Sequence, residues 1–204
     1  ANTVILTVTD NDGVTDTCAA TVTINDPDTD KAVCQDIVVQ LDLNGEATIT
    51  PEQIDNGSYS ACQDVALSLN KTDFTCADLG ANQVVLTADN GVEPATTCTA
   101  TVTVVDEIPP VIGCKDVTVQ LDENGVALIT PGMLVETATD NCGIAEYTTD
   151  ITQLTCNDIG DAQVIVTAID ASGNTGTCAA TVTVEDTMPP NALCQDIIVE
   201  IDMW

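Results

Sequence analysis

The chain has 204 residues, with 33 acidic and three basic side chains, no histidine and a formal net charge of −30. This excess of acid excludes binding to nucleic acid or to an anionic membrane surface, because both attract proteins through Lys and Arg. No apolar run approaches the roughly 20 residues that a membrane span needs, so we expect no membrane insertion.

The ten cysteines recur at a fixed period. Cys18, Cys98 and Cys178 are separated by 98−18 = 178−98 = 80 residues. The remaining cysteines keep the same step: Cys34, Cys114 and Cys194; Cys62 and Cys142; Cys76 and Cys156. Such a period indicates tandem structural modules. We predict complete repeats at 26–105 and 106–185, with the C-terminal part of a repeat at 1–25 and the N-terminal part of another at 186–204.

The two partial repeats have two explanations. Each lacks most of the strands of a module and cannot bury a core alone. The chain is either a window of a longer array, or a subunit whose incomplete ends complement each other between neighbours by strand donation. Met203 and Trp204 do not resemble the end of a repeat. This favours the longer array.

Short β-branched segments alternate with turn sequences along each repeat. Within 106–185 the expected strands are 117–121, 127–130, 163–168 and 180–184, with turns at 122–125 and 171–174. Proline pairs at 109–110 and 189–190 restrict the linkers. No segment shows a sustained 3.6-residue period. The pattern predicts an all-β fold of tandem Ig-like β-sandwich modules, each with six or seven strands in about 80 residues.

Cysteines at fixed positions of a repeat indicate disulfides and an oxidising, extracellular compartment. A zinc site is disfavoured because the chain has no Cys-x-x-Cys pair and no His. A catalytic thiol would lack a His partner for the same reason. Paired carboxylates could hydrolyse a glycoside, but the acids fall at turns and few aromatics could stack on a sugar. We therefore expect no enzyme activity and no organic cofactor.

Four different strings in the 106–185 repeat together form a recognisable pattern: DEIPPVIGC at 106–114, TDNCG at 139–143, TAIDASGNT at 167–175 and CAATVTV at 178–184. They resemble the hyalin-type (HYR) repeat, and the resemblance covers essentially the whole chain. The 26–105 repeat departs from it, with SACQ at 60–63 where the family has DNCG. The resemblance implies Ig-like modules used as adhesive or structural spacers. The subtype is similar to repeats of long secreted or surface proteins of Bacteroidetes-type bacteria.

The disulfide pairing follows from the Ig-like fold that we expect. In such a sandwich the first and last strands begin at the same pole, which favours Cys34–Cys98 and Cys114–Cys178. The remaining pairs are then Cys62–Cys76 and Cys142–Cys156. Four cysteines allow three pairings, so the alternatives stay open. Cys18 and Cys194 occupy the two positions of the longer bridge, and would pair outside this window or between subunits.

Acidic residues are expected to gather at one pole of each sandwich, where calcium could bind through six to eight oxygens. In the 106–185 repeat they are Asp106, Glu107, Asp140 and Asp170. In the 26–105 repeat they are Asp26, Asp28, Asp30, Asp89 and Asn90. The alternative is that they are solvated turn residues, since Asp and Asn favour turns.

These features predict a structural repeat segment of an extracellular filament, stalk or adhesin shaft, stiffened by calcium at the module junctions. Its partners would be neighbouring repeats or identical subunits. The alternatives are a polymerising subunit joined through its incomplete ends, and an adhesive module that binds surface glycans or proteins. A secreted or cell-surface location fits each of them.

Overall fold

A computed structural model describes residues 2–23, 31–60, 64–92, 94–190 and 192–201. The chain divides into two compact units. One is Ala1–Val39, Thr48–Phe74 and Asp78–Val104; the other is Gln40–Ala47, Thr75–Ala77 and Val105–Trp204. Two short loops of the 26–105 repeat therefore belong with the second unit. Within the described residues, strands dominate and each helical element is three or four residues long, which confirms the all-β class.

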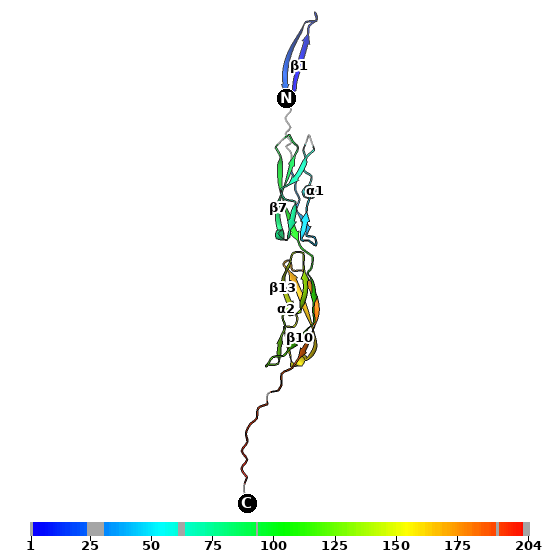
Figure 1. The fold of residues 1–204 in the computed structure, drawn as a ribbon. Helices are drawn as coiled ribbons and strands as arrows, with labels where there is room; N and C mark the ends of the chain where they lie inside the picture. The colour runs from blue at the N-terminus through cyan, green and yellow to red at the C-terminus, as the bar shows by residue number, and fades with distance from the viewer. Residues whose placement is uncertain (1, 24–30, 61–63, 93, 191, 202–204) are drawn as a thin grey trace. The chain divides into compact units, whose positions relative to one another are not determined.

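The chain begins with an antiparallel hairpin (Figure 1). Its strands are β1 (Asn2–Thr9) and β2 (Thr15–Val22), and Leu6 faces Cys18 across the pair. Oδ1 of Asp10 accepts hydrogen bonds from the N–H groups of Asp12 and Val14, both at 2.9 Å. An Asp that accepts from the backbone two residues further on favours a tight turn. The sequence of this segment thus sets its turn locally.

The 26–105 repeat forms six strands and two helical turns among its described residues. They are β3 (Ile37–Gln40), β4 (Glu46–Thr48), α1 (Pro51–Ile54), β5 (Ala66–Leu69), β6 (Asp73–Thr75), η1 (Cys76–Asp78), β7 (Gly80–Asp89) and β8 (Thr96–Val105). The main sheet has the order β3-β8-β7-β5, and β4 pairs with β6. Thr50 is the N-cap of α1, and Pro51 suits the first helical position because its missing N–H is not needed there. This short helix buries Ile54.

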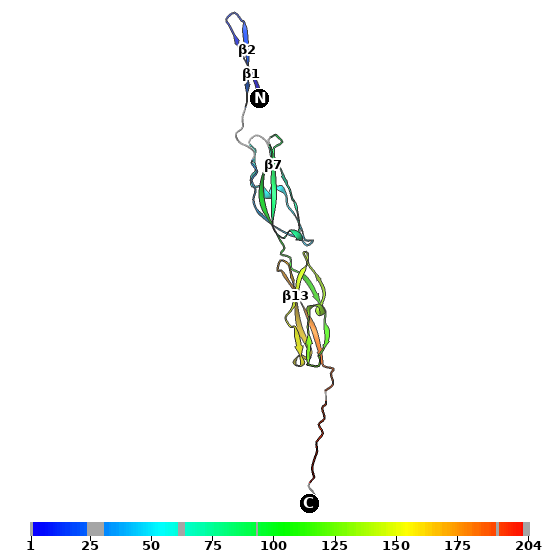
Figure 2. The same ribbon diagram turned by 90° about the vertical axis from the view of Figure 1, so that its left-hand side faces the viewer.

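The 106–185 repeat forms eight strands. They are β9 (Val111–Cys114), β10 (Val117–Gln120), β11 (Val126–Leu128), β12 (Val135–Thr139), β13 (Ile144–Thr149), β14 (Gln153–Thr155), β15 (Gly160–Asp170) and β16 (Thr175–Glu185). The main sheet has the order β10-β16-β15-β13, with β13 at one edge (Figure 2). Strand β10 runs parallel to β16, and the other pairs of this sheet are antiparallel. The helical turns are α2 (Pro131–Leu134) and η2 (Cys156–Asp158).

Period-two alternation builds the core of the 106–185 repeat. Val164, Val166 and Ala168 of β15 are completely buried, because alternate side chains of a strand face the same layer. Leu154 of β14, from the layer where β9 pairs with β12 and β11 with β14, packs into one cluster with Val164, Val166 and Leu134 of α2. These two layers form the predicted Ig-like β-sandwich. Asp170 continues the buried row of β15, so a carboxylate lies at the end of the core.

Candidate cation site and disulfide network

Three carboxylates converge at one end of the 106–185 sandwich. Asp106, Asp140 and Asp170 each offer an oxygen, and these oxygens all lie within 4.8 Å of one another. Asp106 is 5% exposed and Asp170 is 3% exposed, whereas Asp140 is half-buried. The sequence predicted that these three residues would share a pole, and the structure brings them together.

Asp170 is held by the turn between β15 and β16. Its Oδ1 accepts from the N–H groups of Ser172 (2.9 Å) and Asn174 (2.8 Å), and its Oδ2 accepts from Nδ2 of Asn174 at 2.7 Å. The same Nδ2 donates to the carbonyl oxygen of Asp106 at 3.0 Å. Asn174 therefore ties the turn to the segment that carries Asp106. Asp170 is thus a turn residue, but it is buried rather than solvated, and it belongs to the converging group.

Asp106 and Asp140 each keep one oxygen without a hydrogen-bond partner. Oδ1 of Asp106 accepts from the N–H of Ile108 and from Nδ2 of Asn141, both at 3.1 Å, and Oδ1 of Asp140 accepts from the N–H of Cys142 at 2.9 Å. Oδ2 of both aspartates and Oδ1 of Asn141 are buried with no partner among the described residues. Buried acceptors of this kind cost free energy unless something satisfies them. These three oxygens are of the chemical type that a hard cation such as calcium binds.

The charges of the cluster point the same way. Two ionised carboxylates within 4.8 Å repel each other by at least about 3 kcal/mol at an effective dielectric constant near 20. The described cationic side chains form one ion pair, between Lys71 and Asp78, and it lies outside the cluster. Oxygen-only ligands at a few ångströms suit Ca²⁺, which accepts irregular sets of carboxylates, amide oxygens and carbonyls. Calcium therefore fits the oxygen ligands that these residues offer.

Of the rest of the predicted calcium set, the described residues are not part of this cluster. Glu107 is exposed and is not part of the converging group. Asp89 accepts from the N–H of Gly91 at 2.8 Å, and Asn90 accepts from the N–H of Val92 at 2.9 Å, as turn residues do. The predicted ligands Asp26, Asp28 and Asp30 lie outside the described residues. Asn141 and Asn174, which orient the aspartates, were not singled out from the sequence, although both stand in the HYR-like strings.

Two disulfides join the positions that the sequence predicted. Cys34 bonds to Cys98 and Cys114 bonds to Cys178, each over a separation of 64 residues. In the second pair, Cys114 ends β9 and Cys178 lies in β16. The bridge therefore connects the two layers of this sandwich. Disulfides of this kind persist in oxidising compartments, as expected from the cysteine spacing.

The prediction of Cys62–Cys76 and Cys142–Cys156 is wrong where the structure describes it. Cys76 bonds to Cys142 across 66 residues, Cys156 is free and exposed, and Cys62 lies outside the described residues. The reason is geometric. Cys142 precedes β13, whose Ile144 pairs with Asp170 at one end of β15, whereas Cys156 is near Gly160 at the other end. Ten strand steps span about 33 Å, far beyond the Cα separation of about 7 Å that a disulfide allows.

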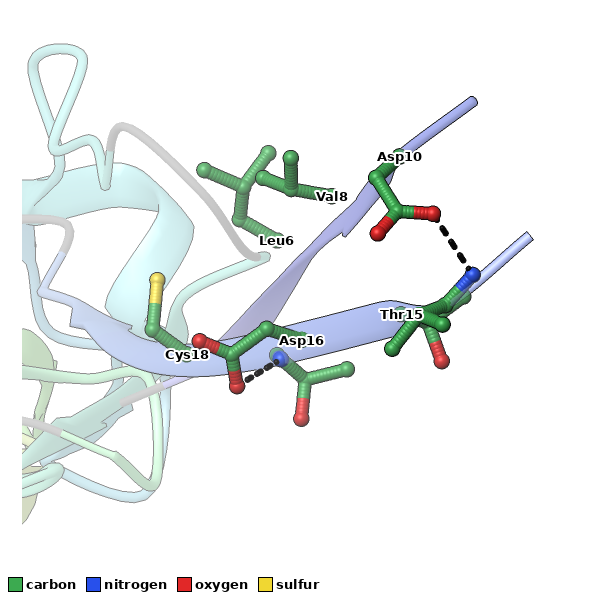
Figure 3. A pocket seen from close by; sticks show the side chains of 8 residues that line it. Leu6, Val8, Asp10, Thr15, Asp16 and Cys18 are labelled. Carbon is green, nitrogen blue, oxygen red and sulfur yellow. Dashed lines mark hydrogen bonds between the residues drawn. The ribbon is translucent and has the colours of Figure 1, made fainter. Parts of the chain in front are cut away.

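The remaining described cysteines, Cys18 and Cys194, are free and exposed. Cys18 lies on the N-terminal hairpin with Leu6 and Val8 (Figure 3). Leu6 and Val8 are about 60% exposed, whereas Leu86 and Ala88, their counterparts 80 residues later, are fully buried. The hairpin thus presents an apolar face that a complete repeat covers.

Comparison with known proteins gives one family match. The HYR domain matches residues 105–184, the repeat that carries the three converging aspartates. This part of the chain therefore matches an HYR-type module, as its strings suggested. No curated protein matches the chain. No helix among the described residues is both long and apolar enough to cross a membrane.

Several solved structures show a distant likeness. Human protocadherin-24 EC1-2 is 10% identical, with a TM-score of 0.41, covering 78% of this chain and 99% of that one. Drosophila N-cadherin EC1-4 is 14% identical, with a TM-score of 0.37, covering 74% of this chain and 47% of that one. Protocadherin gamma B2 EC1-5 is 14% identical, with a TM-score of 0.39, covering 92% and 46%. The fold class rests on the strands and registers described above.

Proposed function

We propose that the chain is a segment of a secreted or cell-surface array of structural or adhesive modules, in which the Asp106–Asp140–Asp170 cluster binds calcium. The buried oxygens without partners, Oδ2 of Asp106 and Asp140 and Oδ1 of Asn141, carry this proposal. The three disulfides among the described residues and the HYR-type module support an extracellular structural role. The bacterial source implied by the sequence resemblance remains a prediction.

In this role the cation would act as a structural tie. Asp106 begins the linker to β9, Asp140 follows β12, and Asp170 ends β15, so one ion would join three separate segments. Calcium would supply two positive charges against three clustered carboxylates. A ligand that binds only the folded state stabilises it by mass action. Cation binding would thus stabilise the module and its linker, which suits a shaft or stalk.

The test is thermal unfolding of the oxidised chain with millimolar calcium and with excess chelator. Calcium should raise the melting temperature by several degrees, because a free calcium concentration 100 times Kd stabilises the folded state by about 2.7 kcal/mol. Magnesium at the same concentration should have a smaller effect, since it demands a stricter octahedral geometry. Equal melting temperatures in calcium and chelator would remove the cation from the proposal and leave the disulfides as the stabilising element.

A second candidate function is polymerisation through the partial repeats. The exposed apolar face of the β1–β2 hairpin favours it, as does the exposed apolar run containing Ile197, Ile198 and Val199. In the 106–185 repeat, Val117 of β10 pairs in parallel with Val182 of β16. Ile197 corresponds to Val117 one repeat later (117+80), and Val22 corresponds to Val182 two repeats earlier (182−160). The same pairing between two chains would set Ile197 of one chain beside Val22 of another. Cys194 would then lie near Cys18. Gel analysis with and without reductant tests it: a Cys18–Cys194 ladder supports polymerisation, and a monomer in both lanes contradicts it.

A further inference from the structure

The Cys76–Cys142 disulfide connects two different repeats, and the loop that carries Cys142 packs against a small group of residues. Four residues form this group, which we call the first loop seat: Asp42, Gly45, Cys76 and Asp106. The loop carrying Asn141 and Cys142 occupies it. Nδ2 of Asn141 donates to the carbonyl of Asp42 at 3.2 Å and to Oδ1 of Asp106 at 3.1 Å, while Cys142 bonds to Cys76.

Close packing at Gly45 shows how tightly the loop fits. The carbonyl oxygen of Asn141 lies 3.4 Å from Sγ of Cys76, and a Cβ on Gly45 would come within 2.8 Å of the same oxygen. Gly45 also has a φ of 75°, a conformation that glycine adopts without strain. The seat therefore requires glycine for both space and backbone geometry.

A second copy of this seat lies one repeat later, within the 105–204 part of the second unit. Its residues are those obtained by adding 80 to each number: Asp122, Gly125, Cys156 and Asp186. All four line one open groove, together with Glu123, Met188 and Pro189. We call this groove the second loop seat. Its cysteine is free and exposed, whereas Cys76 is bonded.

The cysteine sulfur has nearly the same distance to the neighbouring glycine carbonyl in the two seats. Sγ of Cys156 lies 3.7 Å from the carbonyl oxygen of Gly125, and Sγ of Cys76 lies 3.8 Å from that of Gly45. A Cβ added to either glycine would come to 2.5 Å from the neighbouring sulfur. The sulfur of Cys156 thus lies at nearly the same distance from its glycine as the sulfur of the bonded Cys76.

The carboxylates of the two seats agree as well. Asp122 accepts from the N–H groups of Asn124 and Val126, as Asp42 does from Asn44 and Glu46. Oδ1 of Asp186 accepts from the N–H of Met188 at 3.0 Å, just as Oδ1 of Asp106 accepts from Ile108 at 3.1 Å. Asp106 is buried by its surroundings, but Asp186 is exposed.

We propose that the second loop seat is a docking and disulfide site for the Asp-Asn-Cys loop of another repeat of this family. The occupant is defined by the first seat. Its Asn amide would donate to the carbonyl of Asp122 and to the carboxylate of Asp186, and its Cys would bond to Cys156. Repeats of this kind would then be linked in series by covalent bonds, each between Cys76-type and Cys142-type positions. The inference rests on the residues and contacts of the two seats, and its test needs no added cation.

The bond forms by thiol–disulfide exchange. The thiolate of Cys156 attacks the loop cysteine's sulfur in a mixed disulfide with a small thiol. A new S–S bond forms, the old one breaks, and the small thiolate leaves and takes up the proton that Cys156 released. An extracellular low-molecular-weight disulfide supplies the mixed disulfide, so no other oxidant is needed.

The test uses the intact oxidised chain and a synthetic peptide of residues 138–144, Ala-Thr-Asp-Asn-Cys-Gly-Ile, as its mixed disulfide with glutathione. Modified cysteines are mapped by mass spectrometry, and glutathione disulfide alone sets the baseline reactivity of each thiol. Cys18 and Cys194, both free and exposed, are internal competitors. We expect the peptide to favour Cys156 over them by about tenfold relative to glutathione, the scale of two added hydrogen bonds.

Matched variants make the result specific. A peptide with Asn replaced by Ala should lose most of the preference for Cys156, and so should the chain variant Asp186→Ala. The variant Asp196→Ala, which alters an acid outside the groove, should behave as the wild type. The proposal is overturned if the peptide modifies Cys18, Cys156 and Cys194 in the same ratio as glutathione, or if the Asn→Ala peptide keeps the full preference.

Discussion

Asn141 donates a hydrogen bond from Nδ2 to Oδ1 of Asp106 at 3.1 Å, and its own Oδ1 is buried without a partner among the described residues. The next residue, Cys142, is bonded to Cys76. A single loop therefore carries both a disulfide and a side chain that is hydrogen-bonded to the carboxylate cluster. Anchoring this loop through sulfur pre-positions Asn141, so we expect cation binding and the disulfide to support each other.

Replacing Asp106 with Asn should weaken calcium binding by about tenfold or more. The substitution keeps the side chain's shape but removes one of three converging charges, and calcium affinity depends on the number of charged ligands. Isothermal titration calorimetry measures the change. Glu107→Gln is the matched control, because it removes one charge from the adjacent, exposed position. Equal losses in the two variants would show that only net charge matters and that the cluster is no specific site.

Removing the disulfide with the double variant Cys76→Ser, Cys142→Ser should lower the free energy of unfolding by about 2–4 kcal/mol. It should also weaken calcium binding several-fold, because the loop that carries Asn141 loses its covalent anchor. Chemical denaturation and calorimetry on the same samples report both effects. Cys18→Ser, at a free and exposed cysteine, is the control and should change neither. Unchanged calcium affinity in the double variant would separate the disulfide from the cation site.

Gly176→Ala should destabilise the 106–185 repeat by about 1–3 kcal/mol, the usual cost of overpacking. A Cβ at this position would overlap the carbonyl oxygen of Pro110, so the linker from Asp106 could not run past β16 as it does. Gly132→Ala is the matched control, since a Cβ there meets nothing within 4 Å. Urea denaturation of both variants tests the pair, and a Gly176→Ala variant as stable as Gly132→Ala would contradict the expectation.

Much of the fold could be predicted because β-structure leaves a period-two signal. The expected strands at 163–168 and 180–184 lie inside β15 and β16, and the expected turns at 122–125 and 171–174 are present. The 106–185 repeat has eight strands, above the six or seven expected, and β9 and β12 are two that lie outside the named segments. Both are four or five residues long, and β9 directly follows a proline pair, so neither carries a strong pattern of its own.

The candidate site was predicted only in part, for a physical reason. Asp106, Asp140 and Asp170 could be placed at one pole from topology, but the Asn side chains that orient them depend on side-chain packing. The wrong disulfide prediction assumed that the cysteines of one repeat pair only with each other. Cys142 and Cys156 are only 14 positions apart in sequence (156−142), yet a long strand separates them in space. The separation of 66 residues between Cys76 and Cys142, close to the 64 of the other bridges, was the available signal.

Leu154→Ala should lower the free energy of unfolding by about 2–5 kcal/mol, the range for a large-to-small change in a packed core. Leu154 is 2% exposed and belongs to the core cluster of the 106–185 repeat. Leu128 of the neighbouring strand β11 pairs with Gln153 and is 69% exposed, so Leu128→Ala should cost about 0.5 kcal/mol or less. Denaturation curves for the two variants decide the point, and similar losses would mean that Leu154 is not part of a tightly packed core.

Because the pKa values of the turn aspartates Asp42 and Asp122 are lowered in the folded state, we expect the protein to lose stability in acid. The backbone N–H groups of Val126 and Asn124 hold the pKa of Asp122 below its usual range, and those of Glu46 and Asn44 do the same for Asp42. A lowered folded-state pKa means that the carboxylate's stabilising contribution is fully present above the unfolded value of about 3.9 and is lost as the pH falls through the folded value. Melting temperatures should therefore be flat from pH 7 to about 5 and fall below about 4. Asp122→Asn should fall less steeply in acid, whereas Glu123→Gln in the same turn should follow the wild type; if the wild type and Asp122→Asn fall with the same slope, the turn hydrogen bonds are not the cause.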